Sequence, residues 1–243
     1  MLRVLFMTLA VVLVIGFCLG VRHATDSDHV VAVTTIVSRE RSVGAAAWVG
    51  VLWGLGHTVT LLLFGGGIVL FGWEISPRLG LSMEMLVAVM LIALGVGNIS
   101  GVLPRLNERV HRQHAPHPHD ESSFEREPAP YAHLGRLRPF AVGVVHGLAG
   151  SAAIALLVLG TIKSVSLALV YLALFGAGTV AGMLLLTLAM SLPISMLARR
   201  LARVEQLTAR LTGALSIAFG LFLAYRIGVS DGLFLGVPHW KPR

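Results

Sequence analysis

Six long apolar stretches dominate this sequence of 243 residues and restrict what it can fold into. About 17 to 25 apolar residues in a helix cross the hydrocarbon core of a bilayer. Only 13% of the side chains are charged, 56% are hydrophobic, and the mean hydropathy is +0.82, far from soluble composition. We therefore predict an all-α, polytopic membrane protein with six transmembrane helices, at 4–21, 44–72, 84–103, 140–160, 165–197 and 211–228. The second and fifth stretches exceed a straight span, which predicts tilt or a local break.

The first stretch has two interpretations, a transmembrane helix or a cleaved signal peptide. No small-x-small cleavage pattern precedes Arg22, which favours the helix. Cys18 is the single cysteine, so a disulfide framework or a thiol redox pair is excluded.

Lysine and arginine gather on one side of this topology. The loops after the first, third and fifth helices, with the flanking Arg22, hold thirteen of the 19, and the other side holds six. Because cytoplasmic loops retain positive charge, we predict a multi-pass protein of the bacterial inner membrane with both termini outside. The net charge of +7 then has a topological cause, and nucleic acid binding is not needed to explain it.

Residues 104–139 differ from their surroundings, because they are rich in proline and histidine. We expect a disordered cytoplasmic loop between a first three-helix repeat (1–103) and a second (140–243). A flexible group of imidazoles can capture Zn, Ni, Co or Cu with little selectivity; a plain solvated linker is the alternative. The candidate capture residues are His111, His114, His117 and His119.

The strongest signal is the polar run RHATDSDH at 22–29, which lies between two apolar stretches. An Asp near the bilayer centre costs about 2.5 to 3.5 kcal/mol on insertion scales, so its retention suggests a function. In a regular helix His23, Asp26 and His29 would share one stripe while Asp28 pointed away. A site that uses Asp28 with both histidines therefore requires a broken turn, as in transporters whose broken helices hold ions. The alternative is an ordinary solvated loop at the membrane interface.

A lone histidine, His57, lies in the middle of the second stretch. A buried histidine is more often a core residue than a ligand. The histidine motif one helix away and the neighbouring Gly54 and Gly56, which permit close helix approach, favour His57 as a ligand.

Weak internal repetition extends this set. An offset of about 121 to 123 residues places His146 over His23 and Ser151 over Asp28, and brings Ala-Gly-Thr-Val close to the Gly-His-Thr-Val around His57. Two three-helix repeats must have opposite membrane orientations, which puts a site at their interface near the midplane. We predict two inverted repeats, with the first helix broken near the motif.

These motifs resemble the nickel/cobalt transporter (NiCoT) superfamily, whose hallmark is His, four residues, Asp and His in a membrane helix, followed by Gly-His-Ser/Thr. His23, Asp28, His29 and His57 match it, and the resemblance implies that they handle the ion. The stretch HGLAGSAA at 146–153 is more similar to the UreH-like, urease-accessory branch than to the eight-helix permeases. The extra helix that usually precedes the first motif is absent, and a His-rich loop is also found in exporters of this superfamily.

We expect a secondary transporter for a divalent transition metal, Ni²⁺ or Co²⁺, because imidazole and carboxylate ligands without thiolate suit these ions. Export and non-metal solute export are the alternatives. The chain has no phosphate-binding loop and no His-Glu-x-x-His, so we expect no enzyme and no permanent cofactor. A cytoplasmic nickel chaperone or a urease maturation system is a possible partner besides the ion and the bilayer. The expected metal ligands are His23, Asp26, Asp28, His29, His57 and His146, supported by Thr58 and Ser151.

Overall fold

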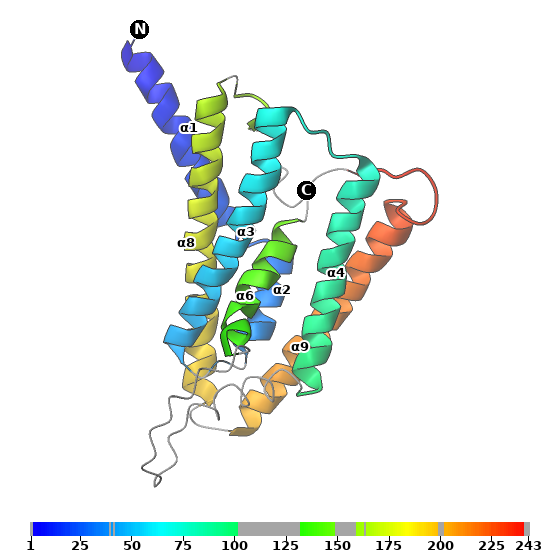
Figure 1. Cartoon of the computed structure of the whole chain (residues 1–243). Helices are drawn as coiled ribbons and strands as arrows, with labels where there is room; N and C mark the ends of the chain where they lie inside the picture. Colours follow the sequence, from blue (N-terminus) through cyan, green and yellow to red (C-terminus); the bar gives the residue numbers. More distant parts are fainter. Residues whose placement is uncertain are drawn as a thin grey trace, which may run out of the picture.

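The computed structural model describes residues 2–38, 40, 42–101, 132–148, 159–162, 164–198 and 202–240, and the regular elements among them are helices (Figure 1). They are α1 (Leu2–His23), α2 (Ser27–Val37), α3 (Val43–Phe71), α4 (Pro77–Ile99), α6 (Ala132–Gly147), α8 (Val165–Ala198), α9 (Ala202–Tyr225) and the π-helical turn η2 (Arg226–Ser230).

Four segments are long and apolar enough to cross a membrane: Val43–Phe71, Pro77–Ile99, Val165–Ile194 and Gln206–Ser230. The pair Ala10–His23 and Ser27–Val37 passes the same test as one span bent by 55°, which gives up to five spans in the described residues. The chain is therefore a polytopic helical membrane protein.

Small polar residues and glycine set the helix boundaries. The Ser42 hydroxyl accepts a hydrogen bond from the Ala45 amide at 3.0 Å where α3 begins, and Ser76 caps α4 ahead of Pro77, both in keeping with N-cap preference. α3 ends at Gly72, whose φ of 63° disfavours any other residue. No Asp, Glu, Lys or Arg interrupts α3 or α8, so both continue through their full apolar stretches.

The helices differ from the predicted spans at several boundaries. α8 agrees with the fifth span, whereas α4 begins at Pro77 rather than 84 because Ser76 caps it there. α6 begins at Ala132, inside the segment predicted as loop, and accommodates Pro139. Residues 149–158, which would complete the predicted fourth span, lie outside the described residues, as does the His-rich part of the loop.

The break in the first span falls inside the polar run. α1 continues to His23, the chain turns through Ala24 to Asp26, and α2 begins with Asp26 as an extended N-cap residue. The Thr25 hydroxyl closes the turn by donating to the Arg22 carbonyl at 2.6 Å. The charge count places Arg22 beside the first loop, but Arg22 lies on α1 just before the break, with its side chain exposed. The difference arises because the first span does not end there.

The helices pack as a layer and a pair. In the layer, α1 packs on α8, α8 on α3, and α3 on α6. The pair is α4 with α9, and α2 contacts both of its members as well as α8 (Figure 1). α2 thus connects the layer to the pair.

Glycines bring the layer into backbone contact. A Cβ at Gly20 of α1 would overlap the Phe175 carbonyl of α8, and one at Gly143 of α6 would overlap the Trp53 carbonyl of α3. Such contacts let helix backbones approach as closely as small-residue membrane interfaces do.

The N-terminus and the C-terminal segment lie at the same end of the bundle. Figure 1 shows α1 beginning at the end where α3 stops and α8 begins. The C-terminal segment returns there, because the Trp240 indole donates to Glu84 near the start of α4 at 2.9 Å. The start of α1 and the C-terminal segment therefore lie at the end of the bundle where α4 begins.

A group of buried polar residues around Asn98 connects α2, α4 and α9. The Asn98 amide nitrogen lies within hydrogen-bond distance of the Thr35 carbonyl (3.1 Å), the Ser38 hydroxyl (3.1 Å), the Ala209 carbonyl (3.0 Å) and the Thr212 hydroxyl (3.3 Å). A buried amide without hydrogen-bond partners costs free energy, because it has lost its contacts with water. Moving the helices apart would break these hydrogen bonds, so the Asn98 group stabilises their spacing.

Candidate metal centre

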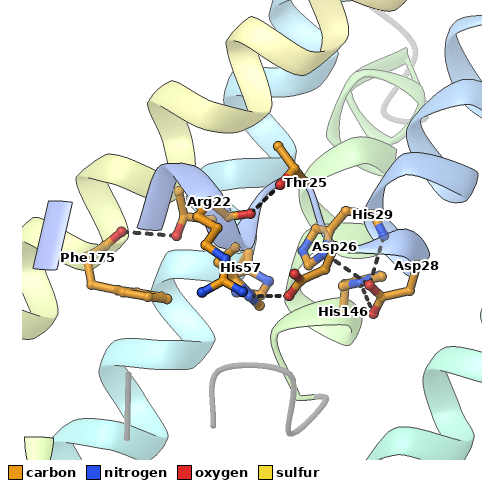
Figure 2. Close-up of polar contacts among 10 residues, drawn as sticks. Arg22, Thr25, Asp26, Asp28, His29, His57, His146 and Phe175 are labelled. Carbon is orange, nitrogen blue, oxygen red and sulfur yellow. Dashed lines mark hydrogen bonds and ion pairs between the residues drawn. The ribbon is translucent and has the colours of Figure 1, made fainter. Parts of the chain in front are cut away.

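Four buried histidines from four helices converge at the break between α1 and α2 (Figure 2). His23 ends α1, His29 lies in the first turn of α2, His57 lies midway along α3, and His146 lies one residue before the end of α6. Each is at most 5% exposed. Residues that are distant in sequence therefore supply one compact cluster of imidazoles.

The first triad is His23, His29 and His57, whose ligand atoms lie within 4.8 Å of one another. The Nε2 atoms of His23 and His57 are 3.0 Å apart. The outer nitrogen of His23, Nδ1, donates to the Asp26 carboxylate at 2.9 Å. That bond fixes the tautomer of His23, leaving the Nε2 lone pair toward His57, as carboxylates do for metal-binding histidines.

The second triad is Asp28, His29 and His146, also with ligand atoms within 4.8 Å of one another. His146 Nε2 donates to Oδ2 of Asp28 at 3.0 Å, and the other oxygen accepts from the His29 amide at 3.0 Å. The Asp28 side chain is 16% exposed. His29 is common to both triads, with its ring centroid 4.1 Å from that of His146 and 5.3 Å from that of His57.

Several side-chain nitrogens of this cluster and of the neighbouring Trp53 are buried without a hydrogen-bond partner in the part of the chain that the structure describes. They are Nδ1 and Nε2 of His29, Nδ1 of His57, Nδ1 of His146 and Nε1 of Trp53. An unsatisfied buried polar group costs about 1 to 3 kcal/mol, and such groups in a folded protein need an explanation. A bound cation would provide such an explanation, because the unprotonated imidazole nitrogens could donate their lone pairs to it.

Close backbone packing holds these side chains in register. A Cβ at Gly147 would meet the backbone of His57, and one at Gly56 would overlap the Phe140 carbonyl. The Thr60 hydroxyl donates across the same interface to the Val144 carbonyl at 3.0 Å. His57 and His146, each adjacent to one of these glycines, therefore have little freedom to move apart.

The donor set is four imidazoles and one directly adjacent carboxylate, with Asp26 behind His23. Cys18, the single thiol, is exposed on α1. Nitrogen and oxygen donors without thiolate suit Ni²⁺, Co²⁺ or Zn²⁺ better than Cu(I). The arrangement can therefore bind a divalent transition metal at the centre of the helical bundle.

The structure brings together five of the six expected ligands: His23, Asp28, His29, His57 and His146. Asp26 belongs to neither triad; it contacts the outer side of His23, with its side chain 41% exposed. Among the described residues, the Thr58 hydroxyl makes no hydrogen bond to the histidines, and it donates to the Gly176 carbonyl of α8 at 3.1 Å. Ser151 and the four loop histidines lie outside the described residues.

Sequence reasoning missed two aromatic neighbours. The Trp53 ring lies 5.6 Å from that of His146 and 6.4 Å from that of His29, and the Phe175 ring lies 5.5 Å from that of His23, between centroids. Trp53 precedes His57 by four residues, so helical spacing could have placed it on the same face. No comparable signal marks Phe175 except the repeat offset, which lays it over Trp53.

Comparison with known proteins gives one strong match. The chain is 38% identical to the urease accessory protein UreH of Bacillus sp. (strain TB-90) over 226 residues, which cover 92% of this chain and 94% of the relative. No family model matches the chain. No solved structure matches it either. Identity of this degree over nearly the whole length, with the His-Asp-His motif gathered at the helix break, shows that the chain belongs to the UreH-like, urease-accessory branch of the nickel/cobalt transporter superfamily.

Proposed function

We propose that the protein is a secondary transporter for Ni²⁺, or alternatively Co²⁺, and that the ion passes through the cluster formed by the two triads. The observation that carries this proposal is the convergence of four buried imidazoles and Asp28 at a broken helix inside a membrane bundle. Ionisable groups at that depth are costly and mark ion pathways. The ion is the substrate, so the proposal needs neither a resident cofactor nor an enzymatic step.

The relative supports nickel in particular. It is named a urease accessory protein, which fits delivery of the ion to a cytoplasmic nickel chaperone or to the urease maturation system. Intrinsic affinities alone would favour Cu(II), so selectivity for nickel must arise from the geometry of the triads.

Matched glycine contacts support two inverted three-helix repeats. Gly20 meets the backbone of Phe175, and Gly143 meets that of Trp53. Gly143 follows Gly20 by 123 positions and Phe175 follows Trp53 by 122, close to the offset between His23 and His146. A pseudo-twofold relation would make these two interfaces equivalent and place the cluster where the repeats meet, as in other secondary transporters.

The proposed roles differ among the acidic residues. Asp28 would contact the ion directly, since it lies within the second triad. Asp26 would orient His23 through Nδ1 rather than ligate the ion. Thr58 would support the site indirectly by fixing α3 against α8, and a supporting role for Ser151 remains a prediction.

Uptake across a bacterial inner membrane is the direction we propose. An interior-negative potential favours cation influx by about 2.3 kcal/mol per charge per 100 mV, and a divalent ion doubles that. The arginine distribution supports a cytoplasmic position for the His-rich loop and an external position for both termini. His111, His114, His117 and His119 would then capture the ion after passage.

Export is the second candidate, because the same run, HRQHAPHPHDE, could load a cytoplasmic ion into an exporter. Export would require coupling, for example to protons. The two directions predict opposite changes in cellular metal.

Accumulation of radiolabelled nickel in a transporter-deficient bacterium tests both. The constructs are the wild type, Asp28→Ala, His57→Ala and a deletion of residues 111–121, with Ser216→Ala as a buried control on α9. Ser216 donates to the Leu91 carbonyl of α4, and it belongs to neither triad. Accumulation that requires Asp28 and His57 supports uptake, whereas wild-type cells that hold less nickel than empty cells support export. Unchanged nickel, cobalt and zinc in every strain would refute metal transport and favour a small-solute exporter.

A further inference from the structure

We propose that the cluster offers the ion two alternative positions, one in each triad, and that His29 passes the ion from one to the other. This inference rests on the proposed function, and it specifies how the cluster works. His29 would ligate the ion in both positions, while the other ligands differ between them.

The two triads pair different ligands beside His29. His57 Nε2 approaches His23 Nε2 at 3.0 Å, whereas His146 Nε2 approaches Asp28 Oδ2 at 3.0 Å. Two ligands at right angles around one ion, each with a bond of about 2.1 Å, are separated by about 3.0 Å. Each pair therefore has the spacing of adjacent ligands on an ion of its own.

His29 is placed to serve both pairs. Both of its ring nitrogens are buried and make no hydrogen bond to the described residues, and Nδ1 lies 3.3 Å from Oδ1 of Asp28. The other histidines differ in this respect, because hydrogen bonds hold Nε2 of His57 and of His146 and both nitrogens of His23. Because no hydrogen bond holds either nitrogen, this imidazole can present its lone pair to either triad after a tautomer change or a ring rotation.

The local charge favours one ion at a time. Two divalent ions would bring four positive charges into a buried space, against the charges of Asp28 and the partly exposed Asp26. Because charges interact strongly in a medium of low dielectric, the second ion would be expelled. The triads are thus successive positions of one ion and not a dinuclear centre.

The backbone supplies a means for the transfer. His29 and Asp28 lie in the first turn of α2, directly after the break at Ala24 to Asp26, whereas His23 lies before the break. A small change of the 55° bend moves the ligands of α2 relative to those of α1 and α3. Broken helices position ions in this way in other transporters.

Co²⁺ binding to the full-length protein in detergent tests the proposal. The variants are His23→Gln, which removes a ligand of the first triad only, His146→Gln, which removes one of the second only, and His29→Gln, which removes one of both. Ser216→Ala is the buried control. Equilibrium dialysis counts ions per chain, X-ray absorption counts imidazole ligands, and size-exclusion elution with thermal unfolding confirms that each variant is folded.

The expected result is one Co²⁺ per wild-type chain, and one per chain in His23→Gln and in His146→Gln with affinity reduced by about 10- to 100-fold. These two variants should give different absorption spectra, because different ligands remain. His29→Gln should lose nearly all binding, and metal accumulation in cells should fail in all three variants.

Three results would overturn the two-position proposal while leaving metal transport intact. They are two ions per wild-type chain, loss of binding in His23→Gln and His146→Gln as complete as in His29→Gln, and wild-type binding and accumulation in His146→Gln. A wild-type protein that neither binds Co²⁺ nor changes cellular metal would instead refute the proposed function itself.

Discussion

Replacement of Gly143 by alanine tests whether the backbone contact between α3 and α6 sets the geometry of the metal centre. A Cβ at this position would overlap the carbonyl oxygen of Trp53. Ordinary contact needs about 3.5 Å, so the helices would have to separate locally by more than about 1 Å. His146 lies three residues further along α6 and His57 four residues beyond Trp53, so the separation acts directly on two ligands.

Both stability and metal accumulation should fall. Overpacking costs about 1 to 3 kcal/mol, although alanine gains up to about 1 kcal/mol over glycine in a helix. Gly66→Ala in α3 is the matched control, because a Cβ there meets nothing within 4 Å and gains the same helix propensity. The difference in unfolding free energy between the two variants isolates the overpacking cost. Each kcal/mol of that difference should lower the unfolding temperature by about 2 to 4 °C for a chain of this size.

Thermal unfolding in detergent and radiolabelled nickel accumulation measure these effects. Metal sites tolerate ligand displacements of about 0.2 Å, so a shift of His146 by several times that distance should lower accumulation at least about tenfold. If Gly143→Ala unfolds at the same temperature as Gly66→Ala and accumulates as much nickel as the wild type, the argument from close packing is wrong.

Three further predictions concern other parts of the structure. Asp26→Asn should weaken Co²⁺ binding about tenfold in equilibrium dialysis, the low end for residues that orient a ligand, because Asp26 holds His23 yet its side chain is 41% exposed. A loss of affinity as large as that of Asp28→Ala would make Asp26 a ligand instead. Metal affinity should fall as acid protonates the ligand histidines, since protonated imidazole cannot ligate, and an affinity that stays flat down to the acid limit of the folded protein would remove the histidines from the account. Asn98→Ala should lower the free energy of unfolding by about 2 to 3 kcal/mol, because buried carbonyls lose their hydrogen-bond donor. Co²⁺ affinity should stay within about twofold of the wild type. Unchanged denaturant unfolding would contradict the role of Asn98 in holding α2, α4 and α9 together.

The helix break could be predicted from sequence because the argument was geometric. A regular helix cannot point His23, Asp28 and His29 to one place, and the structure interrupts the helix between the first of these and the other two. His146 was found by the repeat offset, and the structure places its ring 4.1 Å from that of His29 between centroids.

Other features depended on contacts that a sequence does not display. Asp26 shares the helical stripe of His23, so sequence could not distinguish a ligand from a residue that orients His23 from behind. Arg22 was assigned to a loop because the apolar stretch stops before it, although α1 continues to His23. The start of α6 at Ala132 was missed because several prolines obscure the helical pattern there.

The packing of the layer also constrains how the bundle can change shape. α1 from the first half of the sequence lies on α8 from the second, and α6 from the second lies on α3 from the first, so the halves are interlocked rather than stacked. A motion that parted the two halves would have to pull apart the glycine contacts at Gly20 and Gly143 together. A motion of the α4–α9 pair, carrying α2 and pivoting at the break, leaves both contacts whole. A boundary that spares these glycine contacts runs between the layer and the α4–α9 pair, across the two sequence halves, and His29 of α2 lies beside that boundary.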